Sequence, residues 1–167
     1  MLDNGAWRAF SSRSPWDADS FMRAVDVLGA RADAIVAPDV VCGGQASLDL
    51  TLSFLPLLRT VGTPILIAVQ NGMKPADLPP LGPDLGVFIG GDDAWKESSA
   101  LMWGAEARRA GAPCHMGRVN TARRIHLAAS AGCSSFDGTS ASRYAVNVPS
   151  LTYARRALAL DLVHRAR

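Results

Sequence analysis

Short, continuously apolar runs alternate along this chain with longer stretches in which apolar residues recur at helical spacing. Two of the runs, at residues 34–37 and 64–69, predict buried strands of a parallel sheet. Further short strands are expected at residues 86–89, 114–116 and 133–136. Residues 1–3 look like the end of a further strand that leads directly into a turn. The pattern therefore predicts six strand ends.

Helices are expected after these strands. The apolar spacing places them at residues 19–28, from 47 onward, from 93 to about 110, from 121 to about 132 and at 149–167. Side chains that can cap their N-termini are Ser47, Asp92 or Asp93, and Asn120 or Thr121. The helix that follows Ser47 is expected to turn four apolar side chains inward: Leu50, Phe54, Leu57 and Leu58.

The alternation of strand and helix predicts an α/β fold with right-handed crossovers between parallel strands. The helices are long enough and the loops short enough for a (β/α) barrel of the TIM type, although periodicity alone does not separate a barrel from an open sheet. Six of the eight βα units of such a barrel are expected, with the N-terminal strands missing. Residues 1–167 are interpreted as a single partial or permuted domain, whose exposed sheet edges favour self-association or a missing N-terminal segment.

Composition narrows the class of protein. Hydrophobic residues make up 49% of the chain and the formal net charge is +2, which is typical of a folded protein. The cysteines are odd in number and widely spaced, which favours a reduced, cytoplasmic protein over a disulfide scaffold. The spacing of a structural zinc site is missing, so no metal is expected. The sequence shows neither a signal-peptide pattern nor an apolar run of membrane-spanning length, so no membrane partner is expected.

Arginines are concentrated in the C-terminal half of the chain, at Arg108, Arg109, Arg118, Arg123, Arg124, Arg143, Arg155, Arg156, Arg165 and Arg167. Candidate contacts to the phosphates of a nucleic acid are Arg118, Arg123, Arg124 and Arg143. A set of solvated helix faces explains the same pattern, and a net charge of +2 does not by itself indicate a nucleic-acid partner.

Polar residues gather where the expected strands end, at Asp3, Asp39, Gln70, Gly72, Gly90, Gly91, Asp92 and Asp137. In a barrel these ends converge on one face, so several carboxylates would line one pocket. Carboxylates that lie close together raise one another's pKa, which lets identical groups serve as general acid, general base and nucleophile. Asp3, Asp39 and Asp137 can each also be simple turn or cap residues. For Asp92 and Asp93, capping is the preferred interpretation.

Six short motifs follow one another along the chain: Asp-Asn-Gly-Ala-Trp at residues 3–7, Ala-Pro-Asp at 37–39, Val-Gln-Asn-Gly at 69–72, Ile-Gly-Gly at 89–91, Met-Gly-Arg-Val-Asn-Thr at 116–121 and Phe-Asp-Gly at 136–138. Their content and order resemble the tRNA-guanine transglycosylase (queuine tRNA-ribosyltransferase) family, including the phage and bacterial relatives that insert 7-deazaguanine bases into DNA. The family's versions include Asp-Ser-Gly-Gly-Phe, Val-Gln-Gly-Gly, Ile-Gly-Gly, Met-Gly-Val-Gly-Thr-Pro and Phe-Asp-Cys. The resemblance covers nearly the whole chain.

The resemblance implies a glycosyl transfer. Asp137 would displace guanine from C1′ of a nucleotide and form a covalent glycosyl-enzyme intermediate, and Asp3 would handle the proton of the departing or arriving base. The base would be bound by Asp39, Gln70, Gly72, Gly90 and Gly91. The implied reaction needs no metal or redox cofactor. Its implied partners are DNA or tRNA and a 7-deazaguanine base.

The zinc ligands of the tRNA enzymes, and the subdomain that holds them, have no counterpart here, so DNA is favoured over tRNA. Two other interpretations stay open. A barrel aldolase or isomerase would bind a small phosphorylated molecule at residues 90–92, but Asp92 would repel the phosphate and no lysine lies at a strand end. A non-catalytic remnant of the fold would bind nucleic acid or a partner through the arginine-rich half. His115 and His126 are lone histidines, which are more often packed or exposed than functional.

Overall fold

A parallel sheet lies at the centre of the computed structural model, which describes the backbone of residues 1–165 and the side chains of residues 1–140 and 142–156. Within these residues, five strands lie in the order β1-β2-β3-β4-β5. Their bounds are Ile35–Val36 (β1), Ile65–Val69 (β2), Leu85–Ile89 (β3), Cys114–Met116 (β4) and Ser135–Phe136 (β5). The sixth expected strand is reduced to a single parallel bridge between Leu2 and Ile35, beside β1.

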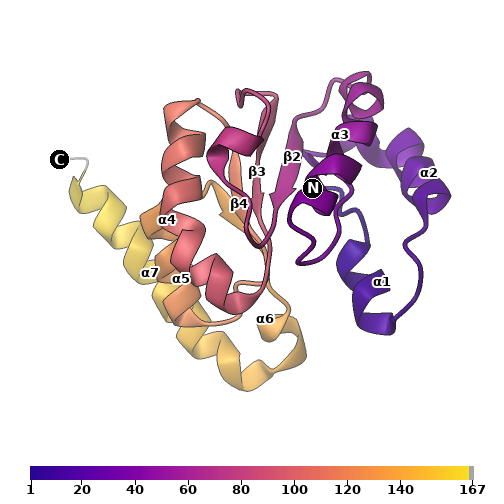
Figure 1. Cartoon of the computed structure of the whole chain (residues 1–167). Coiled ribbons are helices and arrows are strands. Elements are labelled where there is room, and N and C mark those ends of the chain that lie inside the picture. The colour runs from indigo at the N-terminus through magenta and orange to yellow at the C-terminus, as the bar shows by residue number, and fades with distance from the viewer. Residues whose placement is uncertain (166–167) are drawn as a thin grey trace.

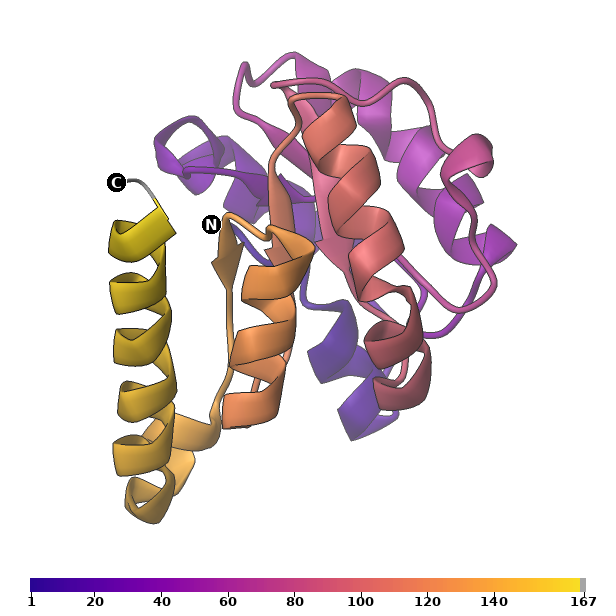
Figure 2. The same cartoon turned by 90° about the vertical axis from the view of Figure 1, so that its left-hand side faces the viewer.

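Helices lie between and around the strands (Figure 1). Their bounds are Ala6–Ser12 (α1), Ala18–Leu28 (α2), Gln45–Arg59 (α3), Asp93–Arg109 (α4), Ala122–Ala131 (α5), Ser140–Arg143 (α6) and Val148–Arg165 (α7). Figure 2 shows α7 running alongside α5. The last two residues of the expected final helix lie outside the described residues. Among the described residues, no helix is both long and apolar enough to cross a membrane.

Each strand pairs with the next one in the sequence, so the sheet does not reverse its order as a doubly wound sheet does. Ile89 lies beside Val69 on one side and Met116 on the other, and Met116 lies beside Phe136. The carboxyl ends of β2 to β5 therefore stay level along one edge. The strands curl into an open half-barrel, which confirms the expected α/β fold with a parallel, partly barrel-like sheet.

The core lies between the sheet and its covering helices. Ile65, Ile67 and Val69 alternate along β2, are almost completely buried, and belong to the same apolar cluster as Leu58 of α3 and Trp103 of α4. Fully burying a large apolar side chain stabilises a fold by about 1.5–3 kcal/mol. This cluster therefore holds the strands in the positions that place their polar ends side by side.

Two of the expected helix caps are confirmed. The Asp92 side chain accepts a hydrogen bond from the Trp95 N–H at the start of α4, and the Thr121 side chain accepts one from the Arg124 N–H at the start of α5. In each case a side-chain oxygen satisfies an N–H group that has no partner within the helix. Asp92 therefore has the structural role that the sequence favoured for it.

Two expectations about α3 are wrong. The helix begins after Gly44, and Ser47 lies buried inside it, where its hydroxyl accepts a hydrogen bond from the Val40 N–H at 3.2 Å. Leu57 is 52% exposed, because Leu55 and Leu58 take the inward positions of the helical stripe. The start of the helix after Gly44 places the Gly43-Gly44 turn close to the end of β2, where a Cβ at position 44 would lie 2.8 Å from the Asn71 carbonyl oxygen.

Candidate functional site

A cavity of about 630 Å³ opens at the carboxyl ends of the strands. This volume falls within the range of about 300–1,000 Å³ that is typical of small-molecule sites. Most of the predicted site residues line it: Asp3, Asp39, Gln70, Gly90, Gly91, Arg118, Arg124, Asp137 and Arg143. Gly72 and Arg123 are not among its lining residues. Gly72 has a φ of 84° in the turn after β2, so its role there is conformational.

Asp39 is buried at the end of β1 and is held by two amide groups. The Asn4 Nδ2 donates to its Oδ1 at 2.7 Å, and the Gln70 Nε2 donates to its Oδ2 at 2.5 Å. Burial raises the pKa of Asp39 to about 6; the charge of Asp3 adds to this shift, while the Asn4 and Gln70 hydrogen bonds oppose it. The two amides therefore fix the position of the Asp39 carboxyl group, and burial makes its charged form less stable than in water.

Gln70 connects three segments of the site. While its amide nitrogen binds Asp39, its Oε1 accepts hydrogen bonds from the N–H groups of Cys42, at 3.0 Å, and Gly91, at 2.8 Å. A Cβ at position 90 would lie 2.8 Å from the Gln70 Nε2, so Gly90 leaves the space that this amide needs. The backbone of Gly91 was expected to bind the base, but its N–H already donates a hydrogen bond to Gln70.

Asp137 follows β5 and is 43% exposed at its side chain. Its Oδ1 accepts a hydrogen bond from the Arg118 N–H at 2.8 Å, and its Oδ2 lies 3.1 Å from the His115 Nε2. Burial raises the pKa of Asp137, but the His115 and Arg118 hydrogen bonds, with the nearby charge of Lys96, outweigh it and leave the pKa below the ordinary value. Asp137 is therefore an ionised carboxylate at neutral pH.

Lys96 is fully buried in the first turn of α4 and lines the cavity. Its Nζ donates a hydrogen bond to the Gly117 carbonyl oxygen at 2.6 Å. Burial lowers the pKa of Lys96 to about 8, and the charge of Arg118 acts in the same direction, while Asp93 and Asp137 oppose it. An amine with this pKa is partly neutral near pH 7 and can act as a nucleophile or a base.

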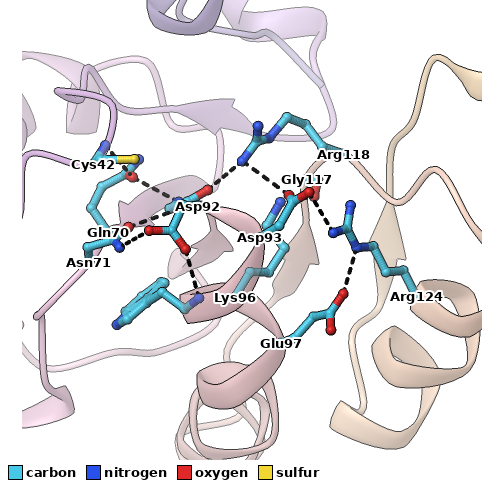
Figure 3. Close-up of polar contacts among 12 residues, drawn as sticks. Cys42, Gln70, Asn71, Asp92, Asp93, Lys96, Glu97, Gly117, Arg118 and Arg124 are labelled. Carbon is cyan, nitrogen blue, oxygen red and sulfur yellow. Dashed lines mark hydrogen bonds and ion pairs between the residues drawn. The ribbon is translucent and has the colours of Figure 1, made fainter.

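Arg118 lies across the cavity (Figure 3). Its guanidinium lies 4.2 Å above the centre of the Trp7 ring, its NH2 group donates to the Gly91 carbonyl oxygen, and it forms an ion pair with Asp93 at 3.7 Å. Cation–π pairs of this kind contribute about 0.5–1 kcal/mol when they are exposed. Arg118 thereby connects α1 to the ends of β3 and β4.

The other predicted arginines differ in exposure and in their ion-pair partners. Arg124 is 13% exposed and pairs with Asp93 at 2.7 Å and Glu97 at 3.2 Å, so its charge is neutralised inside the fold (Figure 3). Arg123 is 81% exposed and pairs with the same Glu97 at 2.6 Å. Arg143 is exposed and lines the cavity from α6. Arg118 and Arg143 are thus the cations best placed to meet a ligand, while the side chains of Arg165 and Arg167 lie outside the described residues.

The polar residues in or beside the site that the sequence interpretation did not include are represented by Asn4 and Lys96, which line the cavity, and by His115, which lies behind Asp137. Asn4 directly precedes Gly5 and gave no sign that its amide binds β1. Lys96 shares one helix face with Ala100, Trp103 and Ala107, and a lysine on an apolar stripe is the signal that could have identified it. His115 was expected to be packed or exposed. It is packed, at 4% exposure, but both ring nitrogens have polar partners.

Within the described residues, no group of three or more His, Cys, Asp or Glu side chains is placed to hold a metal ion. The cavity instead combines carboxylates, a buried amine, amides and arginines. Such groups can transfer protons, attack an electrophilic carbon and bind an anion or a base edge.

Comparison of the chain with known protein families, with curated proteins and with solved structures found no match. Any assignment of function therefore depends on the short motifs and on the geometry of this cavity.

Proposed function

We propose that this chain is a glycosyl-transfer domain that exchanges guanine for a 7-deazaguanine base in a polynucleotide. The main observation in favour is that Asp3, Asp39 and Asp137, which come from three distant parts of the sequence, line one cavity. These are the carboxylates to which the resemblance assigns proton transfer, base binding and nucleophilic attack. Asp39 is held by the Asn4 and Gln70 amides, whereas Asp137 is held by His115 and the Arg118 N–H, so these two carboxylates differ in their surroundings as a division of roles requires.

The first step is an attack by a carboxylate oxygen of Asp137 on C1′ of the nucleotide. As the new C–O bond forms, the C1′–N9 bond breaks and its electron pair goes to N9 of guanine. Asp3 supplies the proton that neutralises the departing base. The products are free guanine and an ester between Asp137 and the sugar. Asp137 suits this role because it is ionised and already oriented by two hydrogen bonds.

The second step replaces the lost base. A 7-deazaguanine enters the cavity, its N9 proton passes to Asp3, and N9 attacks C1′ while the bond to Asp137 breaks. The carboxylate leaves with the electron pair of the C–O bond, so Asp137 returns to its starting state. Two displacements at the same carbon retain its configuration.

Asp39 is the group proposed to bind the edge of the base. A carboxylate accepts hydrogen bonds from the N1–H and the 2-amino group of a guanine-like ring. The Asn4 and Gln70 amides fix the Asp39 carboxyl plane. Because the pKa of Asp39 is about 6, most of this group is ionised at pH 7 and able to accept both bonds. Gln70 and Gly90 are proposed to shape this wall of the cavity.

The polynucleotide is proposed to approach over α6 and α1. Arg143 and Arg118 line the cavity there, and each can bind a backbone phosphate. The polymer is proposed to be DNA or tRNA, and the experiment below distinguishes the two. We also propose that the half-barrel corresponds to the last six units of an eight-stranded barrel, and that further strands or a second copy cover its open edges.

The test is incubation of the purified chain with DNA, and separately with tRNA, containing labelled guanine, together with a 7-deazaguanine base. We expect release of labelled guanine, and a polymer–protein adduct on denaturing gels that mass spectrometry places on Asp137. Asp137→Asn should abolish both, whereas Asp26→Asn, on the exposed face of α2, should leave both unchanged. No exchange with either polymer by the folded protein would contradict the proposal. Equal polymer binding by wild type and Asp137→Asn, with no exchange, would favour the non-catalytic interpretation.

One observation favours a second candidate, a Schiff-base aldolase acting on a small phosphorylated ketone. The sequence offered no lysine at a strand end, but the Lys96 amine reaches the cavity from α4 with a pKa lowered by burial to about 8. Borohydride reduction in the presence of dihydroxyacetone phosphate tests this candidate. A reduced adduct on Lys96 would support it, and the absence of any adduct would exclude this use of the amine for that ketone.

A further inference from the structure

A buried histidine lies directly behind the Asp137 carboxylate. His115 on β4 is paired in register with Ser135 on β5, and Asp137 lies two residues beyond Ser135, on the same face. The imidazole therefore lies between the side chains of Ser135, in β5, and Asp137, which directly follows β5. Its Nδ1 is 2.8 Å from the Ser135 Oγ, and its Nε2 is 3.1 Å from the Asp137 Oδ2.

The chemistry of the partners fixes the direction of these hydrogen bonds. An ionised carboxylate only accepts, so the His115 Nε2 must carry a proton and donate it to Asp137. In the neutral imidazole the Nδ1 is then an acceptor, and the hydroxyl of Ser135 donates to it. The Asp137 carboxylate thus selects the tautomer whose proton faces it, and the Ser135 hydroxyl, which can donate or accept, completes the hydrogen bonding of the ring.

The ring of His115 has little freedom to turn away. It is 4% exposed, and it stacks on Phe88 of β3 with a centroid separation of 5.0 Å and an interplanar angle of 18°. Gly117 leaves room for this stack, because a Cβ at that position would lie 2.5 Å from the end of the Phe88 ring. The line from Ser135 through His115 to Asp137 is therefore held by packing as well as by hydrogen bonds.

Ser135 is not a candidate nucleophile in this arrangement. It does not line the cavity, whereas Asp137 does, and the His115 Nε2 faces the carboxylate rather than the hydroxyl. Asp137 thus faces the cavity, and His115 and Ser135 lie behind it.

We propose that His115 and Ser135 are positioning residues that aim the Asp137 carboxylate and keep it anionic for attack on the sugar carbon. This inference rests on the proposed glycosyl transfer. The Arg118 N–H holds the Oδ1 of Asp137 and His115 holds its Oδ2, so the plane of the carboxylate is fixed from both sides. The same two donors stabilise Asp137 when it leaves the sugar in the second step, because charge returns to the oxygens that they bind.

Three groups facing Asp137 influence its charge: His115 from β4, Arg118 from the loop after β4, and Lys96 from α4. Replacing His115 by leucine removes one of the two groups that donate a hydrogen bond to Asp137. The Arg118 N–H and the Lys96 amine stay in place. A hydrogen bond to a charged group typically changes the pKa of that group by about one unit or more. His115→Leu should therefore raise the pKa of Asp137, and Ser135→Ala should raise it by less. His115→Gln retains an N–H donor near the position of Nε2 and should restore most of the wild-type value.

Two measurements test the inference separately from the proposed function. NMR titration of the ¹³C-labelled Asp137 carboxyl reports its pKa in wild type and in the three variants, whether or not the protein exchanges bases. The rate of adduct formation at pH 7, where Asp39 and Asp137 are both mostly ionised, reports how well that carboxylate is aimed. We expect this rate to fall in His115→Leu and to recover most of its wild-type value in His115→Gln.

Outcomes that overturn the inference are distinct from those that overturn the function. An Asp137 pKa that is the same in wild type, His115→Leu and Ser135→Ala overturns the positioning role. A changed pKa with an unchanged rate of adduct formation at pH 7 also overturns it. If wild type forms no adduct, the proposed function fails, and the NMR titration still decides whether His115 keeps Asp137 ionised. Should His115→Leu fail to fold, Ser135→Ala and His115→Gln provide the same comparison over a smaller range.

Discussion

The Gln70 amide nitrogen lies 2.5 Å from the Oδ2 of Asp39, and this contact joins the end of β2 to the end of β1. The Gln70 carbonyl oxygen also accepts hydrogen bonds from the Cys42 and Gly91 N–H groups. Replacement of Gln70 by leucine would leave these donors and the buried Asp39 with fewer partners. Each buried group left unpaired costs about 1–3 kcal/mol. We therefore expect Gln70→Leu to lower the free energy of unfolding by roughly 2–4 kcal/mol, measured by urea denaturation.

Gln45 provides a matched control for this change. It lies exposed at the start of α3, where its amide bonds only to the exposed Asp49 among the described residues. Gln45→Leu should change the free energy of unfolding by no more than about 0.5 kcal/mol. Equal losses in Gln45→Leu and Gln70→Leu would show that the hydrogen bonds of Gln70 do not hold the strand ends together.

Asp39 should make stability fall as the pH rises from about 4 to about 6. Burial raises its pKa from 3.8 to about 6, so within this range the folded protein binds more protons than the unfolded chain. The free energy of unfolding then decreases with rising pH, by up to roughly 3 kcal/mol for a shift of this size. Asp137 acts in the opposite sense, and only below its ordinary pKa of 3.8, because its own pKa is lowered.

The measurement compares wild type with Asp39→Asn in urea at pH 4, 5, 6, 7 and 8. The difference in free energy of unfolding, wild type minus variant, should fall between pH 4 and pH 7 and then stay level. A difference that is constant across the whole range would mean that the Asp39 charge is not penalised in the folded protein.

The fold could be predicted in part because β1 and β2 are continuously apolar, buried and followed by polar residues, whereas β5 is a short, exposed strand. The run that ends at Val69 predicted β2, since a strand covered on both faces needs no alternation of polar and apolar residues. Leu2 could not be predicted in the same way. Its single bridge to Ile35 depends on how far the N-terminal residues follow β1, which is a long-range contact with no periodic signal. Leu57 was misplaced because neighbouring leucines occupy both the inner and the outer faces of α3.

The site could be predicted only in part. Asp39, Gln70 and Asp137 each follow a strand of the sheet, so the parallel topology alone brings their side chains to one edge of the sheet. Lys96 reaches the same cavity from inside a helix, and its buried amine finds its partner in the Gly117 carbonyl oxygen, which is distant in the sequence. The bonds of His115 depend on the register of two neighbouring strands. Sequence order does not fix that register, so a lone histidine gave no indication of its two partners.

Gly104 on α4 should be intolerant of alanine, although alanine is the better helix former. A Cβ at position 104 would lie 1.9 Å from the carbonyl oxygen of Ala131 on α5, so the two helices would have to separate. Alanine would gain at most about 1 kcal/mol in helix propensity, whereas overpacking typically costs about 1–3 kcal/mol.

We expect a net loss of stability in Gly104→Ala, seen as a lower midpoint in thermal unfolding. Ala105→Ser, at the exposed neighbouring position, should leave the midpoint nearly unchanged. A gain of stability in Gly104→Ala would show that α4 and α5 lie farther apart than described.

Lys96 should make stability rise with pH between about 8 and 10.5. Burial lowers its pKa to about 8 from 10.5, so within this range the unfolded chain binds more protons than the folded protein. The free energy of unfolding of wild type, relative to Lys96→Met, should therefore increase by up to roughly 3 kcal/mol as the pH rises through this window. Lys74→Met is the control, because Lys74 is the chain's other lysine and is exposed. Urea unfolding of the three proteins from pH 7 to pH 10 provides the measurement. The same pH dependence in both variants would contradict a buried, partly neutral amine at the cavity wall, and with it the use of Lys96 as a nucleophile.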